Sequence, residues 1–433
     1  MAAVAVATVA SVSYVRPVHT MAMAVALKLQ DSMPSLMYKS CHGSSPKGDL
    51  CCLVHNSRAT AVVGSKVQSD SWAAHGVYVR GIRKAANWTL MEEKGKKKGA
   101  GMRPHSSLRA AVVETTQPSK QLKTGTWQWS YEGNQLNIHY VEHSGSEGRP
   151  SKTLLLLPSL SDVSTTEEWQ AVAETLVKQS GSDNWRAVVV DWPGLGLSDR
   201  PPIEYTVDVL EKFLIDLVLD ANGPLGLTSE DVPVIIGGGH AATIAARAVS
   251  KGAINAQAIA AVAPTWAGPL PIVFGRSPTM ETRYGLLRGT LRSPGMGWAM
   301  YKYLVSSPKN IRLQYLTHVY ADADNVTAAV VENRTLLTQR EGARFAPAAF
   351  LTGLLDPVQS REEFLSLFAE LEGKVPVLVL SSMKSPRRSR AEMEALRGAK
   401  GVTKFVEIPG ALLPQEEYPD DVATLLITFL NEL

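Results

Sequence analysis

Short, continuous runs of apolar residues recur along the chain from about residue 125. They cover Leu154–Leu157, Ala187–Val190, Val232–Ile236 and Ala258–Val262, and strand signals return at Val375–Leu380 and Thr403–Ile408. Runs of this length are typical of strands that are buried on both faces of a parallel sheet. Ahead of them, Trp127, Trp129 and Tyr131 alternate with polar residues, as does the stretch 136–141. This alternation predicts an antiparallel hairpin that turns near residues 132–134.

Helical segments lie between these predicted strands. Thr206 precedes a segment whose apolar residues share one face, and we expect it to cap that helix. Ser164 and Glu167 have the spacing of a capping box before a helix over 169–177. The last helix is expected from about Gln415 to Leu433. Alternating strands and helices with short connections predict a doubly wound α/β sheet.

The segment 267–372 interrupts this alternation, because it is mostly helical and carries prolines and glycines in its early part. It is too long for a loop, so we expect an inserted helical subdomain. The predicted organisation is an arm over 1–110, a core in two parts over 125–266 and 373–433, and a helical cap over 267–372. Most of the cap's aromatic residues are expected in its interior: Trp298, Tyr301, Tyr303, Tyr315 and Tyr320.

Charge separates the arm from the rest of the 433-residue chain. Residues 1–110 hold 15 Lys and Arg against 5 Asp and Glu, and the remainder holds 29 against 36. The arm is rich in Ala, Val, Ser and Met without a sustained period, which is typical of an organelle transit peptide, either plastid or mitochondrial. The stretch Ser107–Ala111 resembles a plastid processing site, so we expect chloroplast localisation, in the stroma. The alternatives are a disordered tail that is retained and a nuclear signal at Lys94–Lys98.

Composition excludes several classes of function. A mildly acidic body argues against nucleic acid as a partner. The body contains no run of 18 apolar residues, so we expect no transmembrane segment there. The body after residue 110 has no cysteine, which excludes a disulfide, a thiolate-bound metal and a cysteine nucleophile there. We expect neither a metal nor a cofactor, and the oligomeric state stays open. The three cysteines all lie in the arm: Cys41, Cys51 and Cys52.

Two segments of the body carry a recognisable pattern. Residues 191–201 read D-W-P-G-L-G-L-S-D-R-P, and residues 413–419 read L-P-Q-E-E-Y-P. They resemble the D-x-x-G-x-G-x-S-D-x-P turn and the L-P-x-E-x-P ending of the α/β-hydrolase superfamily, in its capped epoxide hydrolase and haloalkane dehalogenase branch. The resemblance covers 125–433 and implies the α/β-hydrolase fold, a mostly parallel eight-stranded sheet with an inserted helical cap. Asp191 is expected to fix the loop of the first motif.

The resemblance also implies a nucleophile on a strand-to-helix elbow, a histidine base and an acid that orients it. The elbow must follow the strand at 232–236, where residues 237–245 read G-G-G-H-A-A-T-I-A. By alignment, the nucleophile position is Gly239, the acid position is Ser385 and the histidine position is Leu412. None of these residue types performs the expected step. His240 is the one titratable residue close to the elbow.

His240 has two interpretations. It is either a general acid–base or ligand-binding group, or a neutral histidine at a helix N-terminus that bonds a neighbouring loop; we prefer the second. Backbone N–H groups of His240 and of Ser159 or Leu160 are candidates for an oxyanion-type pocket. Asp356 is expected to begin or end a cap helix. The predicted ligand pocket is lined by Pro158, Ser159, Gly238, Gly239, His240 and Trp266.

Three functions fit these observations. The first is a plastid protein of this fold that lacks the Ser-His-Asp triad, is non-hydrolytic, and binds a small apolar ligand or a protein partner. The alternative is an active hydrolase of an ester, epoxide or related bond, which uses non-standard residues such as His240 with a cap carboxylate. The third is a purely structural subunit of a plastid complex.

Overall fold

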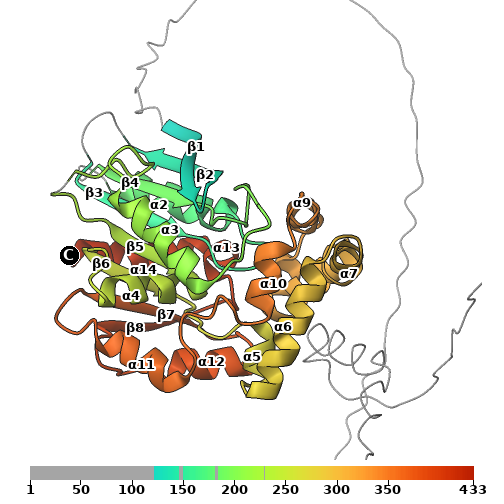
Figure 1. The fold of residues 1–433 in the computed structure, drawn as a ribbon. Coiled ribbons are helices and arrows are strands. Elements are labelled where there is room, and N and C mark those ends of the chain that lie inside the picture. The colour runs from blue at the N-terminus through green and yellow to red at the C-terminus, as the bar shows by residue number, and fades with distance from the viewer. Residues whose placement is uncertain (1–120, 146–149, 181–183, 229) are drawn as a thin grey trace, which may run out of the picture. The chain divides into compact units, whose positions relative to one another are not determined.

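The computed structural model describes residues 121–145, 150–180, 184–228 and 230–433. Their strands form one sheet in the order β1-β2-β4-β3-β5-β6-β7-β8 (Figure 1). β1 and β2 pair antiparallel, β2 and β4 also pair antiparallel, and the remaining neighbours are parallel. The predicted eight-stranded, mostly parallel sheet is therefore confirmed. Its strands are β1 (Gln121–Tyr131), β2 (Asn134–Ser144), β3 (Lys152–Leu157), β4 (Trp185–Val190), β5 (Val234–Gly238), β6 (Ala258–Val262), β7 (Val377–Ser382) and β8 (Lys404–Ile408).

The predicted hairpin is formed by β1 and β2, with Tyr131 paired to Asn134. The two residues between them, Glu132 and Gly133, have φ values of 46° and 79°. Two successive positive φ values are the signature of the tight turn whose twist matches that of the flanking strands. Gly133 adopts this conformation without a steric penalty, so a short polar turn is enough to reverse the chain.

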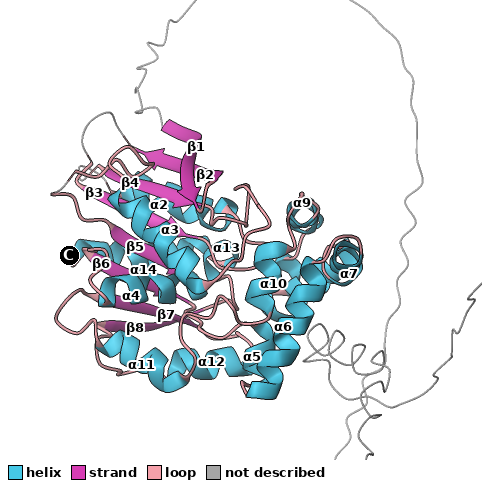
Figure 2. Ribbon diagram, in the orientation of Figure 1, coloured by secondary structure: helices cyan, strands magenta, loops and turns pink. Residues whose placement is uncertain are grey.

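Helices cover both faces of the sheet (Figure 2). One face packs against α3 (Val207–Leu219), α4 (His240–Ser250) and α11 (Arg361–Ala369). The other packs against α2 (Gln170–Gln179) and α14 (Pro419–Asn431). The run 154–157 shows why the strands are continuously apolar: Leu155 and Leu157 join the first core, and Leu154 and Leu156 join the second.

The predicted helix starts have different outcomes. Thr206 caps α3 as predicted, because its Oγ1 accepts the Val209 N–H at 3.3 Å. The capping box of Ser164 and Glu167 is wrong. A short 3-10 helix, η1 (Thr166–Trp169), precedes α2 and has no side-chain cap, and Ser164 Oγ lies 3.1 Å from Ser161 Oγ. A neighbouring hydroxyl thus replaces the backbone N–H as the partner of Ser164.

The predicted C-terminal helix is also corrected, since it is two helices, α13 (Pro414–Glu417) and α14. Tyr418 separates them with φ −130° and ψ 60°. A proline disfavours helical backbone in the residue before it, so Pro419 ends α13 and begins α14. The predicted apolar stripe of α14 lies in the second core, with Val422, Leu426 and Leu430 fully buried.

Helices occupy the chain between β6 and α11, and we call the segment from α5 to α10 the helical insert. Tyr301, Tyr315 and Tyr320 are buried within it, whereas Trp298 is half-buried and Tyr303 is 77% exposed. α11 follows the insert, and its Phe364 and Phe368 pack in the core of the sheet. The insert contains α5 (Pro269–Phe274), α6 (Pro278–Arg292), α7 (Met296–Leu304), α8 (Pro308–Gln314), η3 (Tyr315–Val319), η4 (Ala323–Asn325), α9 (Ala328–Thr338) and α10 (Phe345–Leu351). One more helix, α12 (Arg387–Glu394), follows β7.

Candidate functional site

The turn from β5 into α4 forms the sharp elbow that the sequence predicts. Gly239 lies between them with φ 54° and ψ −126°, and its N–H donates to the Val262 carbonyl at 3.0 Å. A Cβ at Gly237 would lie 2.6 Å from the Ala242 nitrogen, so the helix packs directly on the strand end. Glycine at 237 and 239 therefore has a local cause, which is close approach at the first position and a positive φ at the second.

Two hydroxyl groups border the space above Gly239. A Cβ added there would lie 3.4 Å from Thr265 Oγ1 and 3.6 Å from Ser159 Oγ. Ser159 follows β3 and Thr265 follows β6. The carboxyl ends of neighbouring parallel strands meet at one edge of a sheet, which is the usual place for a ligand. The structure thus brings Ser159 and Thr265 close to Gly239.

His240 is the first residue of α4 and is 2% exposed. Its Nδ1 lies 2.7 Å from Thr265 Oγ1, and its Nε2 lies 3.4 Å from Asp356 Oδ1. The Phe350 ring meets the imidazole edge to face, with the ring centres 5.1 Å apart. Both ring nitrogens are therefore directed at side chains from other loops. With the proton on Nε2, His240 donates to Asp356 and accepts the Thr265 hydroxyl proton.

Asp356 lies in the loop between α10 and α11 and is 1% exposed. Its Oδ1 accepts the Gly268 N–H at 2.8 Å, and its Oδ2 accepts from Arg276 Nη2 at 2.5 Å. The prediction that Asp356 begins or ends a cap helix is wrong, because Asp356 lies in a loop away from both helix ends. Its carboxylate instead joins the start of the insert to His240. A separation of 116 residues hides this contact from any local pattern.

A second polar cluster lies beside the elbow. Glu168 Oε2 accepts the Ser159 N–H at 2.9 Å and the Gln415 side-chain amide at 3.1 Å. All three side chains are buried. Burial, reinforced by the nearby negative charge of Glu416, raises the pKa of Glu168 to about 8. The Ser159 N–H was one of the donors expected in an oxyanion-type pocket, and here it donates to the chain's own carboxyl group.

The aligned acid position, Ser385, and the aligned histidine position, Leu412, lie in the loops that follow β7 and β8. Ser385 is 7% exposed, and its Oγ lies 2.5 Å from Ser382 Oγ. Leu412 is half-buried, directly before the turn into α13. Trp266 is half-buried and donates its indole N–H to Glu392 at 3.2 Å. Pro158, Ser159, Gly238 and His240 are all buried around the elbow.

Asp191 fixes the loop of the first motif, as predicted. Its Oδ2 accepts the Leu197 N–H at 2.8 Å and lies 3.1 Å from His139 Nδ1. Gly196 has φ 52°, and a Cβ there would overlap the Asp191 carboxylate. Glycine is thus required at 196 both for the backbone conformation and for space.

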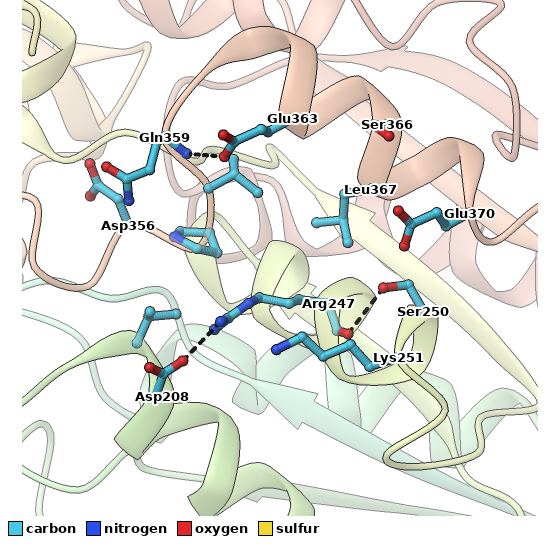
Figure 3. Close-up of a pocket in the computed structure, with 13 residues that line it drawn as sticks. Asp208, Arg247, Ser250, Lys251, Asp356, Gln359, Glu363, Ser366, Leu367 and Glu370 are labelled. Atoms are coloured by element: carbon cyan, nitrogen blue, oxygen red, sulfur yellow. Dashed lines mark hydrogen bonds and ion pairs between the residues drawn. The ribbon is translucent and has the colours of Figure 1, made fainter.

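Two open grooves lie next to Asp356, which lines both of them. The first has a volume of about 450 Å³ and lies between α3, α4, α11 and the loop 356–359 (Figure 3). An ion pair crosses its floor, where Arg247 donates to Asp208 at 2.8 Å (Figure 3). The second has a volume of about 350 Å³ and lies between α3 and the insert. Neither groove is lined by Gly239 or His240.

Two further features concern only the part of the chain that the structure describes. No helix there is long and apolar enough to span a bilayer. No three side chains of His, Cys, Asp or Glu gather there in an arrangement that would hold a metal ion.

Comparisons with known proteins agree with this architecture. A family model described as "Alpha/beta hydrolase family" matches residues 154–425. A thermophilic esterase from Thermogutta terrifontis is 20% identical, with a TM-score of 0.50 over 72% of this chain and 98% of its own. A probable hydrolytic enzyme from Pseudomonas aeruginosa is 16% identical, with a TM-score of 0.51 over 71% and 93%. A haloalkane dehalogenase from Agrobacterium tumefaciens is 18% identical, with a TM-score of 0.48 over 71% and 97%. No curated protein matches the chain significantly.

Proposed function

The chain belongs to the alpha/beta hydrolase family, and from this premise we propose that it is a non-hydrolytic member that binds a small apolar ligand or a protein partner. We further propose that residues 1–110 direct it to the chloroplast stroma, where that ligand or partner resides. The support for this second part is the composition of the arm.

The observation that carries the first proposal is Gly239 at the elbow. Hydrolysis in this fold needs a side-chain nucleophile there, and glycine has none. The aligned base and acid positions hold Leu412 and Ser385, which neither carry nor orient a proton for an acyl transfer. The Ser159 N–H donates to Glu168 at 2.9 Å, so this donor is not free for the oxyanion of a substrate.

The test is an assay of the full chain with 4-nitrophenyl acetate, 4-nitrophenyl butyrate and a fluorophosphonate probe. We expect no probe labelling, and hydrolysis that is identical in the wild type and in His240→Gln. Laurate and farnesol serve as apolar probes for ligand-induced thermal stabilisation, and tagged full chain in stromal extract serves to detect a stoichiometric partner. Hydrolysis that disappears in His240→Gln would refute the proposal.

One observation favours a second candidate, an active hydrolase centred on His240. Thr265, His240 and Asp356 supply a hydroxyl, an imidazole and a carboxylate in sequence, at 2.7 and 3.4 Å. In this scheme the Thr265 oxygen attacks an ester carbonyl while its proton passes to Nδ1 of His240. Asp356 holds the proton on Nε2 and stabilises the imidazolium that forms, and the imidazolium returns a proton to the leaving alcohol.

Conservative variants of Thr265 separate the two candidates. Thr265→Val removes the hydroxyl at nearly constant shape, and Thr265→Ser retains it. An enzyme that uses this trio loses about 10⁴-fold in kcat in the valine variant and keeps activity in the serine variant. It also carries the probe on the peptide that contains Thr265. Equal rates in both variants and an unmodified peptide support the non-hydrolytic proposal, and circular dichroism checks that each variant is folded.

A further inference from the structure

A carboxyl group of the chain itself occupies a buried pair of hydrogen-bond donors beside the elbow. Glu168, in η1, is 1% exposed. Its Oε2 accepts the backbone N–H of Ser159 at 2.9 Å and the amide N–H of Gln415 at 3.1 Å. Gln415 is on α13 and is completely buried. Two donors separated by 256 residues in the chain thus converge on one oxygen atom.

The shape of the neighbouring backbone preserves this donor pair. A Cβ at Gly238 would lie 2.6 Å from Ser159 Oγ and 2.8 Å from Gln415 Nε2. Any side chain at 238 would therefore displace the Ser159 hydroxyl and the Gln415 amide that donates to Glu168. Gly238 is the last residue of β5 and directly precedes the elbow, so the donor pair lies beside the elbow.

The surrounding charges do not neutralise Glu168. Arg334, on α9, donates to Glu416 at 2.7 Å, to Glu167 at 2.6 Å and to the Tyr315 hydroxyl at 3.0 Å, and its positive charge lowers the pKa of Glu168 less than burial and Glu416 raise it. Glu416 adds a negative charge that opposes ionisation of Glu168, and burial opposes it more strongly. Ser164 also faces the carboxyl group through its side chain. The raised pKa of Glu168, about 8, favours the neutral carboxylic acid at pH 7.

We propose that Ser159 N–H and the Gln415 amide form a binding site for an uncharged carboxyl group, and that Glu168 fills it as an internal ligand. The site accepts a small carboxylic acid once the side chain of Glu168 is removed. This inference does not depend on whether the chain hydrolyses an ester, because occupancy is measured without turnover.

The variant Glu168→Ala tests the site, since it deletes a CH₂–COOH fragment of the size of acetic acid. We expect acetate, at pH 5.5, to raise the thermal midpoint of the full-length variant by about 2 °C or more at saturating concentration. Because the neutral acid binds, the total acetate needed for half of this effect should increase about tenfold per pH unit between pH 5.5 and 7.5. Pivalate, which is bulkier, should have no effect.

Glu168→Gln is the matched control, because its amide keeps the site filled. Acetate should leave the midpoints of this variant and of the wild type unchanged relative to equimolar chloride. A similar shift in all three proteins identifies a general salt effect and overturns the proposal, as does the absence of a shift in Glu168→Ala. If Glu168→Ala does not fold alone, refolding yield from urea decides: recovery with acetate and not with chloride supports the site, and failure in both, while Glu168→Gln folds, overturns it.

Discussion

At the scale of single residues, Glu168 links the free energy of unfolding to pH. Its pKa is raised from 4.5 to about 8 by burial and by Glu416. Between these values the folded chain keeps a proton that the unfolded chain releases, so stability decreases as pH rises. This contribution is fully present below about pH 4.5 and is lost above about pH 8, at about 1.4 kcal/mol per pH unit between them.

Urea unfolding at pH 5, 6, 7 and 8 measures this slope. Glu168→Gln cannot ionise, and we expect its unfolding free energy to lack the decline that the wild type shows. Glu432→Gln removes an exposed carboxylate that pairs with Lys404 and should leave the decline in place. A wild-type decline that persists in Glu168→Gln would assign the proton to another group.

The two glycines with φ near 50° at the edge of the sheet should respond differently to alanine. At Gly239 the added Cβ has its nearest neighbour, Thr265 Oγ1, at 3.4 Å, so strain of about 1–3 kcal/mol dominates. At Gly196 the same strain is joined by overlap with the Asp191 carboxylate, which holds the Leu197 N–H. We expect Gly196→Ala to be the more destabilising by urea unfolding; equal losses would show that strain alone governs both sites.

At the scale of elements, sequence patterns predict what is decided locally. The run 154–157 identifies a strand because both of its faces are buried. Thr206 identifies a helix start because its hydrogen-bond partner, Val209, is only three residues further along the chain. Ser164 fails for a comparable reason, since Ser161 competes for its hydroxyl. Pro419 predicts the break at Tyr418, because a proline disfavours helical backbone in the residue before it. The apolar stripe that follows Pro419 instead suggests one continuous helix.

The candidate site was only partly predictable. Gly239 and His240 lie in one short motif, so their proximity follows from the local sequence. Thr265 carried a readable signal, because it follows a predicted buried strand at the edge where ligands bind. Asp356 and Glu168 carried none. Each acts through contacts with residues that only the folded chain brings near, at separations of 116 residues for His240 and 247 for Gln415.

A buried arginine is one of the links between α9 of the insert and the core. Arg334 is 3% exposed in its side chain and bonds Glu167 of η1 and Glu416 of α13. Arg334→Met leaves Glu416 unpaired, and we expect a loss of about 3–5 kcal/mol in unfolding free energy. Arg361→Met, which removes a pair that is half exposed, should lose at most about 1 kcal/mol.

Hydrogen exchange distinguishes a local effect from a global one in the Arg334→Met protein. We expect protection to fall first in α9 and η3, because Arg334 bonds Tyr315 of η3 and links α9 to Glu167 and Glu416, while protection in β3 and β5 stays unchanged. Uniform loss of protection would show instead that the insert and the sheet unfold as one unit.

At the scale of the whole molecule, the chain combines a basic arm with a mildly acidic body. Residues 1–110 carry ten more basic than acidic residues, whereas the remainder carries seven more acidic than basic ones. An acidic body does not favour nucleic acid, so the basic arm has to be explained by a separate role. Import into an organelle is such a role, because a leader that is basic and poor in acids is recognised independently of the protein that it carries.

A reporter experiment tests this assignment of the arm. Residues 1–110 fused ahead of a fluorescent protein should accumulate in chloroplasts, and residues 111–433 fused to the same protein should not. Replacing the four lysines between 94 and 98 with glutamine separates the two possible addresses. Chloroplast import should survive this change, since it depends on the composition of the whole arm, whereas a nuclear signal would be lost with the cluster. Nuclear fluorescence that disappears in the glutamine variant would therefore contradict the plastid proposal.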